Sequence, residues 1–267
     1  MFRSIPPNAQ QNLAAPRGFT ARISGLFSGG QKRASVPEGM RVYAVGDIHG
    51  CTAELDRLTT AIVRDGQDWE GERRLVYVGD YIDRGPDSKG VIDRLLNPPP
   101  GFTVCHLRGN HEQALLDFLA DPNVFLTWRE FGARETLMSY GVMPPRFEAV
   151  SALAEVQQRF RDALPPEHLR FFEGLELSAT IGGYFFAHAG VRPGVALDRQ
   201  VAEDLLWTRD EFLLSSAEFG AVVIHGHTPT LDPVRRPNRI GIDTGAYATG
   251  KLTAAVLEGT ECRFLTS

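Results

Sequence analysis

The stretch G-D-Y-I-D-R-G-P at residues 79–86 directly follows the apolar run L-V-Y-V at 75–78. A short apolar run bounded by Gly and Pro predicts a buried strand that ends in a tight loop. The loop contains two carboxylates, Asp80 and Asp83, followed by Arg84. Turn chemistry alone accounts for the Gly, Asp and Pro. The other interpretation is a ligand site, because ligands bind at the carboxyl ends of strands in α/β sheets.

The same order of apolar run, polar loop and helical pattern recurs along the chain. Three runs each precede a helical pattern: 42–45 with 51–65, 75–78 with 87–96, and 102–107 with 111–120. Residues 121–173 show helical patterns broken by prolines and no strand signal, which predicts a helical cap insertion. Further strands are predicted at 175–180, 183–187, 221–224, 239–243, 251–257 and 261–265. This alternation indicates an α/β fold with a mixed β core and helices outside.

Composition places the chain among ordinary globular proteins. It has 267 residues, 43% apolar and 23% charged, which suits one folded domain over 41–267 with the insertion 121–173 inside it. No apolar stretch approaches the roughly 20 residues of a membrane helix, so no membrane partner is expected. The cysteines are Cys51, Cys105 and Cys262. Their odd number and unpaired spacing predict reduced thiols and a cytoplasmic location.

The charge is unevenly distributed. Residues 1–37 contain five basic and no acidic residues, so with a net charge of -5 the remainder carries -10. That balance argues against a nucleic-acid surface on the folded part. The basic tail 1–40, rich in Pro, Gly, Ser and Gln, is expected to be disordered, with an organelle transit peptide as the alternative.

Polar side chains follow five of the predicted strands. The motifs are GDIHG at 46–50, GDYIDRG at 79–85, RGNHE at 108–112, AHAG at 187–190 and HGHT at 225–228. If these strands share a sheet edge, their polar side chains meet there. The motifs supply oxygen and imidazole donors without thiolates, a mixture that suits Mn, Fe or Zn.

In this order the motifs resemble the phosphoprotein phosphatase family of calcineurin-like metallophosphoesterases. The closer resemblance is to bacterial and bacteriophage-lambda-type serine/threonine phosphatases. It rests on LRGNHEQ at 107–113, LLWTRDEFL at 205–213, HGHTP at 225–229 and IDTGAYATGKLT at 242–253. The likeness extends over residues 41–258 and implies a layered sandwich of mixed β-sheets flanked by helices.

The resemblance also implies two divalent metal ions, manganese first, with iron or zinc as alternatives. Asp47, His49 and His227 would hold the first ion, Asn110 and His188 the second, and Asp80 would bridge them. A bridging hydroxide would attack phosphorus directly.

The resemblance further implies the acid and the phosphate-binding groups. His111 would protonate the leaving oxygen, and Asp83 would orient and charge its ring. Arg84, Arg108 and Arg209 would hold phosphate oxygens, as planar guanidinium groups do.

Three functions remain open from the sequence. The preferred one is a serine/threonine or dual-specificity protein phosphatase that acts on phosphoproteins, phosphopeptides and small phosphate esters. Asp83 and Glu112 favour this reading over a symmetrical dinucleoside polyphosphate hydrolase, whose matching stretches more often lack them. An inactive binding module is disfavoured because every expected ligand is present. The oligomeric state is not predicted.

Two competing motifs are rejected. Cys51-x5-Arg57 has the spacing of a cysteine phosphatase loop, but it contains Glu54 and Asp56 and reads as a helix. GAYATGKL at 245–252 lacks the Ser or Thr that ends a P-loop.

Four remaining side chains receive separate expectations. His106 is expected in the core or behind the site, His168 exposed on the insertion, and His225 near the site without binding metal. Tyr247 is expected to reach the rim of the site.

Overall fold

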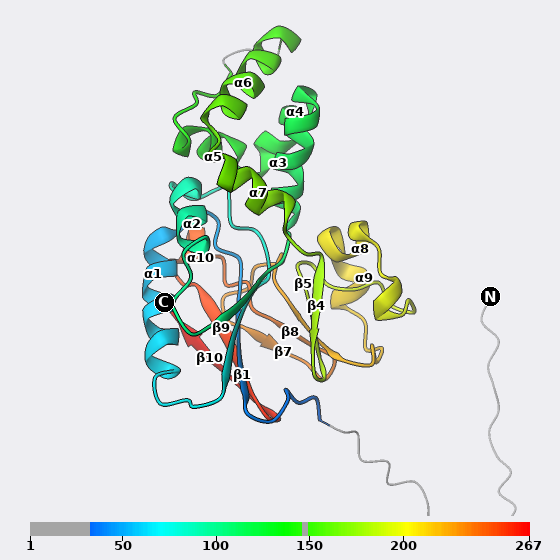
Figure 1. Cartoon of the computed structure of the whole chain (residues 1–267). Coiled ribbons are helices and arrows are strands. Elements are labelled where there is room, and N and C mark those ends of the chain that lie inside the picture. The colour runs from blue at the N-terminus through cyan, green and yellow to red at the C-terminus, as the bar shows by residue number, and fades with distance from the viewer. Residues whose placement is uncertain (1–32, 146–148) are drawn as a thin grey trace, which may run out of the picture. The chain divides into compact units, whose positions relative to one another are not determined.

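The computed structural model describes residues 33–145 and 149–267, and its strands form two sheets (Figure 1). The first sheet contains β1 (Met40–Val45), β2 (Glu72–Tyr77), β3 (Thr103–His106), β9 (Thr253–Glu258) and β10 (Glu261–Thr266), in the order β10-β9-β1-β2-β3. The second contains β4 (Ser178–Ile181), β5 (Tyr184–Ala187), β6 (Val222–His225), β7 (Val234–Arg235) and β8 (Arg239–Gly241), in the order β4-β5-β6-β8-β7.

Both sheets are mixed. In the first, β1, β2 and β3 are parallel, β9 runs antiparallel beside β1, and β10 runs antiparallel beside β9. In the second, β5, β6 and β8 are parallel, and β4 and β7 form antiparallel edges. The parallel strands of each sheet therefore end at one edge.

Alternate side chains of each strand separate the core into layers. Val42 and Ala44 of β1 pack between the sheets with Phe186 of the second sheet. Tyr43 and Val45 face outward against α1 (Thr52–Asp65), α2 (Ser88–Leu95) and α3 (Asn110–Ala120). The outer face of the second sheet is covered by α8 (Ala202–Trp207) and α9 (Asp210–Leu213), with η3 (Leu197–Arg199) before them. This arrangement confirms the predicted fold class.

The helical insertion follows α3. Its elements are η1 (Pro122–Val124), α4 (Phe125–Trp128), η2 (Arg129–Phe131), α5 (Ala133–Ser139), α6 (Val150–Ala163) and α7 (Pro166–Glu173). The buried rings of Phe118, Trp128 and Phe160 join it to α3. His168 was expected to be exposed, and that is wrong. It is 1% exposed, with its ring between the Tyr140 hydroxyl (2.8 Å) and an Asp93 carboxylate oxygen (3.0 Å).

The ordered packing begins before residue 41. Val36 is buried, and its N–H donates to the carbonyl of Gly259. The part of the predicted tail at 1–32 lies outside the described residues. Strand β7 is not predicted from the sequence, because a strand of two residues has no periodicity.

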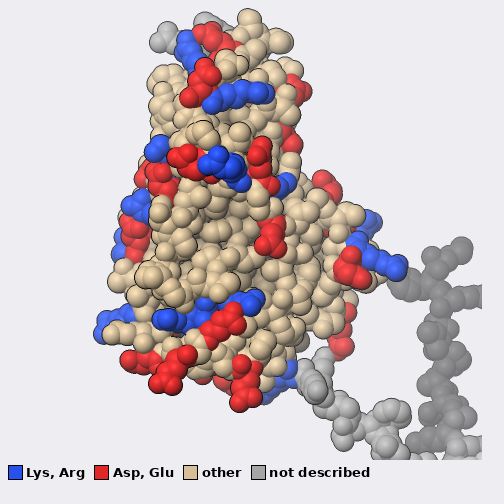
Figure 2. Space-filling model, in the orientation of Figure 1, with Lys and Arg blue, Asp and Glu red and all other residues tan. Residues whose placement is uncertain are grey.

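Two surface properties follow from the described residues. Within 33–145 and 149–267, no helix is both long and apolar enough to cross a bilayer. On the face shown in Figure 2, acidic and basic side chains are interspersed over the insertion and the sheets.

Candidate metal and catalytic site

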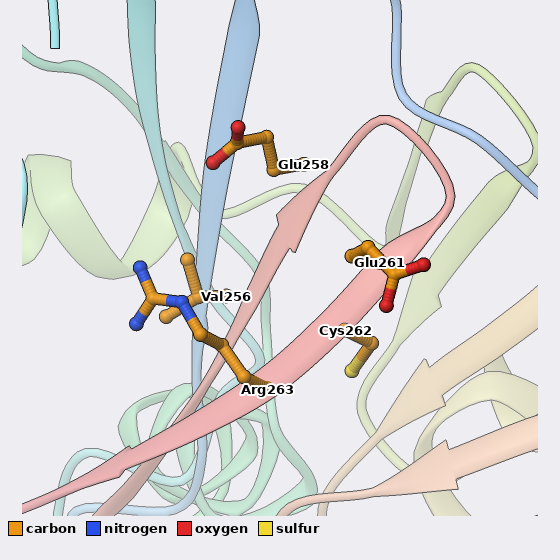
Figure 3. A pocket seen from close by; sticks show the side chains of 5 residues that line it. All are labelled: Val256, Glu258, Glu261, Cys262 and Arg263. Carbon is orange, nitrogen blue, oxygen red and sulfur yellow. The ribbon is translucent and has the colours of Figure 1, made fainter.

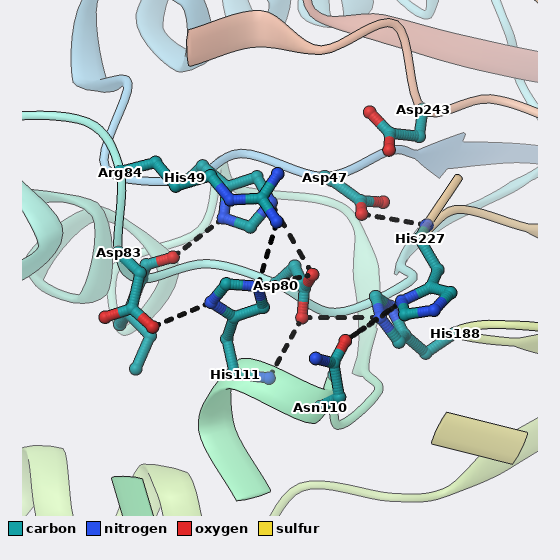
Figure 4. Close-up of polar contacts among 12 residues, drawn as sticks. Asp47, His49, Asp80, Asp83, Arg84, Asn110, His111, His188, His227 and Asp243 are labelled. Carbon is teal, nitrogen blue, oxygen red and sulfur yellow. Dashed lines mark hydrogen bonds and ion pairs between the residues drawn. The ribbon is translucent and has the colours of Figure 1, made fainter. Parts of the chain in front are cut away.

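The polar side chains of the candidate site lie where the parallel strands end. Asp47 and His49 follow β1, Asp80 and Asp83 follow β2, Asn110 and His111 start α3 after β3, His188 follows β5, and His227 follows β6. Figure 4 shows these side chains converging from both sheets. The motifs meet as expected, but at the ends of strands from two sheets and not at the edge of a single sheet.

The backbone is strained at these loops. Within the described residues, the non-glycine residues with positive φ are His49, Asp80, Asp83, Arg84 and His227, at +47° to +72°. Such conformations cost about 1–3 kcal/mol each and occur mainly at functional sites. Glycine permits the close approach of neighbouring loops, since a Cβ at Gly226 would lie 1.8 Å from an Asp47 carboxylate oxygen. The strained backbone at these loops therefore supports the presence of a functional site.

Asp80 lies at the centre of the cluster. One carboxylate oxygen is 3.5 Å from Nε2 of His49, and the other is 3.3 Å from Nε2 of His188. Asp80 is 2% exposed. Its two oxygens therefore face two different groups of donors, the geometry that a bridging ligand requires.

The imidazoles are oriented for metal binding. Nδ1–H of His49 donates to the carbonyl of Ile82 (2.9 Å), and Nδ1–H of His188 donates to that of Val78 (3.0 Å). Each bond leaves Nε2 with its lone pair facing the cluster. Burial, together with neighbouring positive groups, lowers the pKa of both histidines to about 3, so both rings are neutral and can bind metal.

The position of His227 differs from the division implied by the resemblance. Its Nδ1 lies 3.0 Å from Oδ1 of Asn110 and 3.2 Å from Nε2 of His188. Its link to the first group is through the backbone, whose N–H donates to Asp47 (2.8 Å). The side chain therefore lies with Asn110, which follows the first sheet, and with His188, which follows the second.

The residues present fit a metal centre. Two clusters, His49–Asp80–His111 and Asp80–His188–His227, each place their donor atoms within 4.8 Å of one another. Oδ1 of Asp47 and Nε2 of His227 are buried and have no protein hydrogen-bond partner. Burial and the nearby carboxylates of Asp243 and Asp80 raise the pKa of Asp47 well above its usual range. Bound cations would relieve this crowding of acids.

A buried network holds His111 through its Nδ1. Its Nδ1–H donates to Asp83 at 2.7 Å, and Nε2 faces Asp80 at 3.6 Å. Asp83 is 0% exposed and also accepts from Trp128 Nε1 (2.7 Å) and the Thr136 hydroxyl (2.5 Å). Burial opposes protonation of His111, but Asp80 and Asp83 outweigh it and raise its pKa. Sequence analysis missed Trp128 and Thr136, which lie far along the chain in the insertion.

Glu112 supports the backbone of the site. Its carboxylate accepts the N–H groups of Asp80, Tyr81 and Gly109 at 2.8–2.9 Å, and it is fully buried. It joins the loop after β2 to the start of α3.

The three arginines have different positions. The Arg84 guanidinium lies 3.4 Å from Nε2 of His111 and 4.7 Å from the ring of Tyr247. Exposed Arg209 lies near enough to His227 to contribute to its low pKa. Arg108 instead donates to Gln113 and to the carbonyls of Glu173 and Leu175. Its hydrogen bonds join α3 to the end of α7. These bonds do not support the expected contact of Arg108 with phosphate.

Contacts with neighbouring rings show where the remaining histidines and Tyr247 lie. His106 stacks on Tyr77 in the first sheet, and buried His225 packs against Phe212. Tyr247, on α10 (Ala246–Thr249), is 42% exposed and contacts the His49 ring at 5.4 Å, so it reaches the rim as expected.

Other candidate groups do not join the cluster. Cys51 is buried at the start of α1, and burial raises the pKa of its thiol to about 11, so it is no nucleophile. Lys251 of the P-loop-like segment pairs with Asp232 at 2.6 Å. The hollow lined by Val256, Glu258, Glu261, Cys262 and Arg263 (Figure 3) lies at the other end of β9 from the residues that pair with Val45.

One acid was not included in the predicted site. Asp243 follows β8 as the others follow their strands, and Figure 4 shows it beside Asp47. Burial raises its pKa to about 6. The acid after the apolar run in I-D-T-G at 242–245 was the signal that could have found it.

Comparison with known proteins agrees with this geometry. The bis(5'-nucleosyl)-tetraphosphatase PrpE [asymmetrical] of Geobacillus sp. (strain WCH70) is 28% identical over 80% of this chain and 89% of its own length. A solved structure assigned as a diadenosine tetraphosphatase shares the fold with a TM-score of 0.56 at 24% identity, over 85% of this chain and 93% of that one. A cold-active protein tyrosine phosphatase shares it with a TM-score of 0.55 at 15% identity, over 87% and 81%. The model of the calcineurin-like phosphoesterases matches residues 40–255, and the chain belongs to this family of hydrolases.

Proposed function

We propose that this protein is a dinuclear-metal hydrolase of dinucleoside polyphosphates. The observation that carries the proposal is the likeness to bis(5'-nucleosyl)-tetraphosphatases over 80% of the chain. Those relatives are of the asymmetrical kind, so we expect a dinucleoside tetraphosphate to yield a nucleoside triphosphate and a nucleoside monophosphate. The symmetrical reaction, which was the alternative expected from the sequence, would yield two nucleoside diphosphates.

The sequence argument for a protein phosphatase depended on Asp83 and Glu112. Both are 0% exposed. Asp83 lies behind His111, and Glu112 is occupied by backbone N–H groups. Neither can touch a substrate, so neither discriminates between a phosphopeptide and a dinucleotide.

Within this proposal the metal ligands form two groups. Asp47 and His49 would hold one divalent ion, and Asn110, His188 and His227 the other, with Asp80 between them. Manganese is the metal we expect for this set of oxygen and imidazole donors. When bound, the two ions supply an activated water and neutralise charge on the phosphate.

The chain's own groups complete the reaction. Arg84 and Arg209 would hold phosphate oxygens, as guanidinium groups do. The attacking water, having lost one proton on activation, would bond to phosphorus through its oxygen, and the electron pair of the breaking P–O bond would stay with the leaving phosphate. His111, oriented by Asp83, would give its proton to that leaving oxygen.

A substrate panel tests the proposal. Metal-stripped enzyme restored with manganese is assayed on a dinucleoside tetraphosphate, a phosphoserine peptide, a phosphotyrosine peptide and a small aryl phosphate. We expect the highest kcat/KM on the tetraphosphate, with a triphosphate and a monophosphate as products. A higher value on the phosphoserine peptide would favour the protein phosphatase, and no turnover of any substrate would favour a binding module. The Asp80→Asn variant provides the background rate.

A further inference from the structure

An aromatic strip extends from His111 toward the second group of metal ligands. The Phe131 ring lies 5.7 Å from the ring of His111, and the Trp207 ring lies 5.8 Å from Phe131. Trp207 in turn lies 6.4 Å from the ring of His227. The strip is thus continuous along one side of the site, and we call Phe131 and Trp207 the aromatic strip below.

The fold holds both rings in place. Phe131 precedes Gly132, which has φ +105° and lies so close to Arg84 that a Cβ would be 2.5 Å from its backbone nitrogen. Trp128, one turn earlier, donates to Asp83. On the other side, the carbonyl of Leu205 accepts the N–H of Ala189 at 2.8 Å, so the end of α8 is tied to the loop of His188.

The two rings differ from the aromatic core around them. Trp128, Phe118 and Phe160 are 0% exposed, as packing residues are. Phe131 and Trp207 are only partly buried. The aromatic strip therefore offers ring surface to solvent directly beside a proton donor.

We propose that the aromatic strip stacks the nucleobase of the leaving nucleotide. This inference rests on the proposed function. In an in-line displacement the leaving oxygen departs opposite the attacking water, on the side of the group that protonates it. That group is His111, and Phe131 is the partly exposed ring in contact with it. The leaving nucleotide therefore lies on the side of the aromatic strip, where every base has a face that can stack.

Binding measurements test the strip without depending on turnover. The dissociation constants of ATP and of inorganic tripolyphosphate are measured on the full-length protein, metal-free and with manganese restored. We expect the wild type to bind ATP about tenfold or more tightly than tripolyphosphate, the order of one stacked base. Phe131→Leu and Trp207→Leu should bring this ratio close to one at the same free manganese concentration, with little change in tripolyphosphate binding.

Matched controls separate stacking from packing. Phe102→Leu and Trp69→Leu remove partly buried rings that contact Tyr43 and Arg41, away from the site, and should keep the wild-type ratio. A wild type without preference for ATP overturns the proposal. An unchanged ratio of the two dissociation constants in the strip variants, or an equal loss of affinity for both ligands, also overturns the proposal. If the wild type prefers ATP but fails to cleave the dinucleoside tetraphosphate, the proposed function is wrong, whereas the binding of a base by the aromatic strip is supported.

Discussion

At the scale of single residues, the site depends on which atoms of each side chain are already engaged. His49 and His188 use Nδ1–H on backbone carbonyls and keep Nε2 for metal, whereas His111 uses Nδ1–H on a carboxylate. The same residue type therefore has two roles, because a carbonyl leaves the ring neutral and Asp83 favours its protonated form.

Replacing His111 by Asn tests the acid. We expect kcat to fall by about 10²–10⁴-fold, the usual contribution of a general acid, because an asparagine amide cannot give up a proton to the leaving oxygen. Metal content, measured by elemental analysis, should stay at the wild-type level. Loss of both metals would contradict the role and make His111 a ligand.

Replacing Trp128 by Phe tests the support of Asp83. The change removes the Nε1–H that donates to Asp83 at 2.7 Å and keeps the ring. A hydrogen bond to a charged group contributes about 1.5–3 kcal/mol, so stability should fall by about that amount. Turnover should fall about tenfold with KM unchanged, because His111 loses its fixed orientation.

The matched control for this change is Trp69→Phe. The Trp69 Nε1–H donates at 3.3 Å to the exposed carbonyl of Glu72, away from the site. That variant should have wild-type kcat. Equal kinetic loss in both variants would show that Trp128 acts through general stability.

At the scale of elements, the helical insertion supports the candidate site. It contributes Trp128 and Thr136 to Asp83, Phe131 to the side of His111, and Gly132 to the contact with Arg84. An insertion that packed only on α3 would leave Asp83 with an exposed edge.

A Gly132→Ala substitution tests this contact. The new Cβ would lie 2.5 Å from the backbone nitrogen of Arg84, at a φ of +105°. Left-handed strain of about 1–3 kcal/mol plus the clash should lower the urea midpoint and reduce kcat/KM. Gly141→Ala is the control, because Gly141 has φ +78° but no atom within 4 Å of a Cβ. It should lose stability by strain alone and keep kcat/KM, and an equal kinetic loss would argue against the contact.

Strand β3 contributes to the acid sensitivity of the fold through His106. Burial lowers the pKa of His106 to about 4, so the ring is neutral when folded. The unfolded chain therefore binds the proton more tightly, and stability present above pH 6.5 is lost as pH falls toward 4. The shift corresponds to about 3 kcal/mol.

The His106→Phe substitution measures this contribution. Phe keeps a ring to stack on Tyr77 but cannot titrate. We expect the difference in unfolding free energy between pH 7.5 and pH 4.5 to be about 2–3 kcal/mol smaller than in the wild type. Urea unfolding at both pH values measures it, and an unchanged difference would refute the assignment.

At the scale of the whole catalytic domain, the site is the junction of the two sheets. β1, β2 and β3 deliver Asp47, Asp80 and Asn110, and β5 and β6 deliver His188 and His227. Because Asp80 faces donors from both sheets, a metal held there connects the two halves of the sandwich.

Metal removal should therefore destabilise the entire fold. At metal concentrations about 100-fold above Kd, binding adds about 2.7 kcal/mol per site, so chelation should lower the thermal midpoint and manganese should restore it. Asp80→Asn should abolish this shift together with activity. Asp198→Asn, at an exposed carboxylate of η3, should retain it. Tight retention of two metals by the Asp80 variant would exclude the bridging role.

Sequence patterns predicted every strand except β7 and every clustered donor except Asp243. Alternating apolar runs predicted the strands, and the residues that end them, from Asp47 to His227, are adjacent to those runs in the chain. Local spacing carries such information because a strand and its loop are continuous. The tertiary structure was needed to show which donors lie together, that Arg108 bonds to Gln113 and the end of α7, that His168 is buried, and that Trp128, Thr136 and Phe131 surround Asp83 and His111. Those outcomes depend on side-chain directions and on contacts between segments far apart in the chain, which local periodicity does not encode.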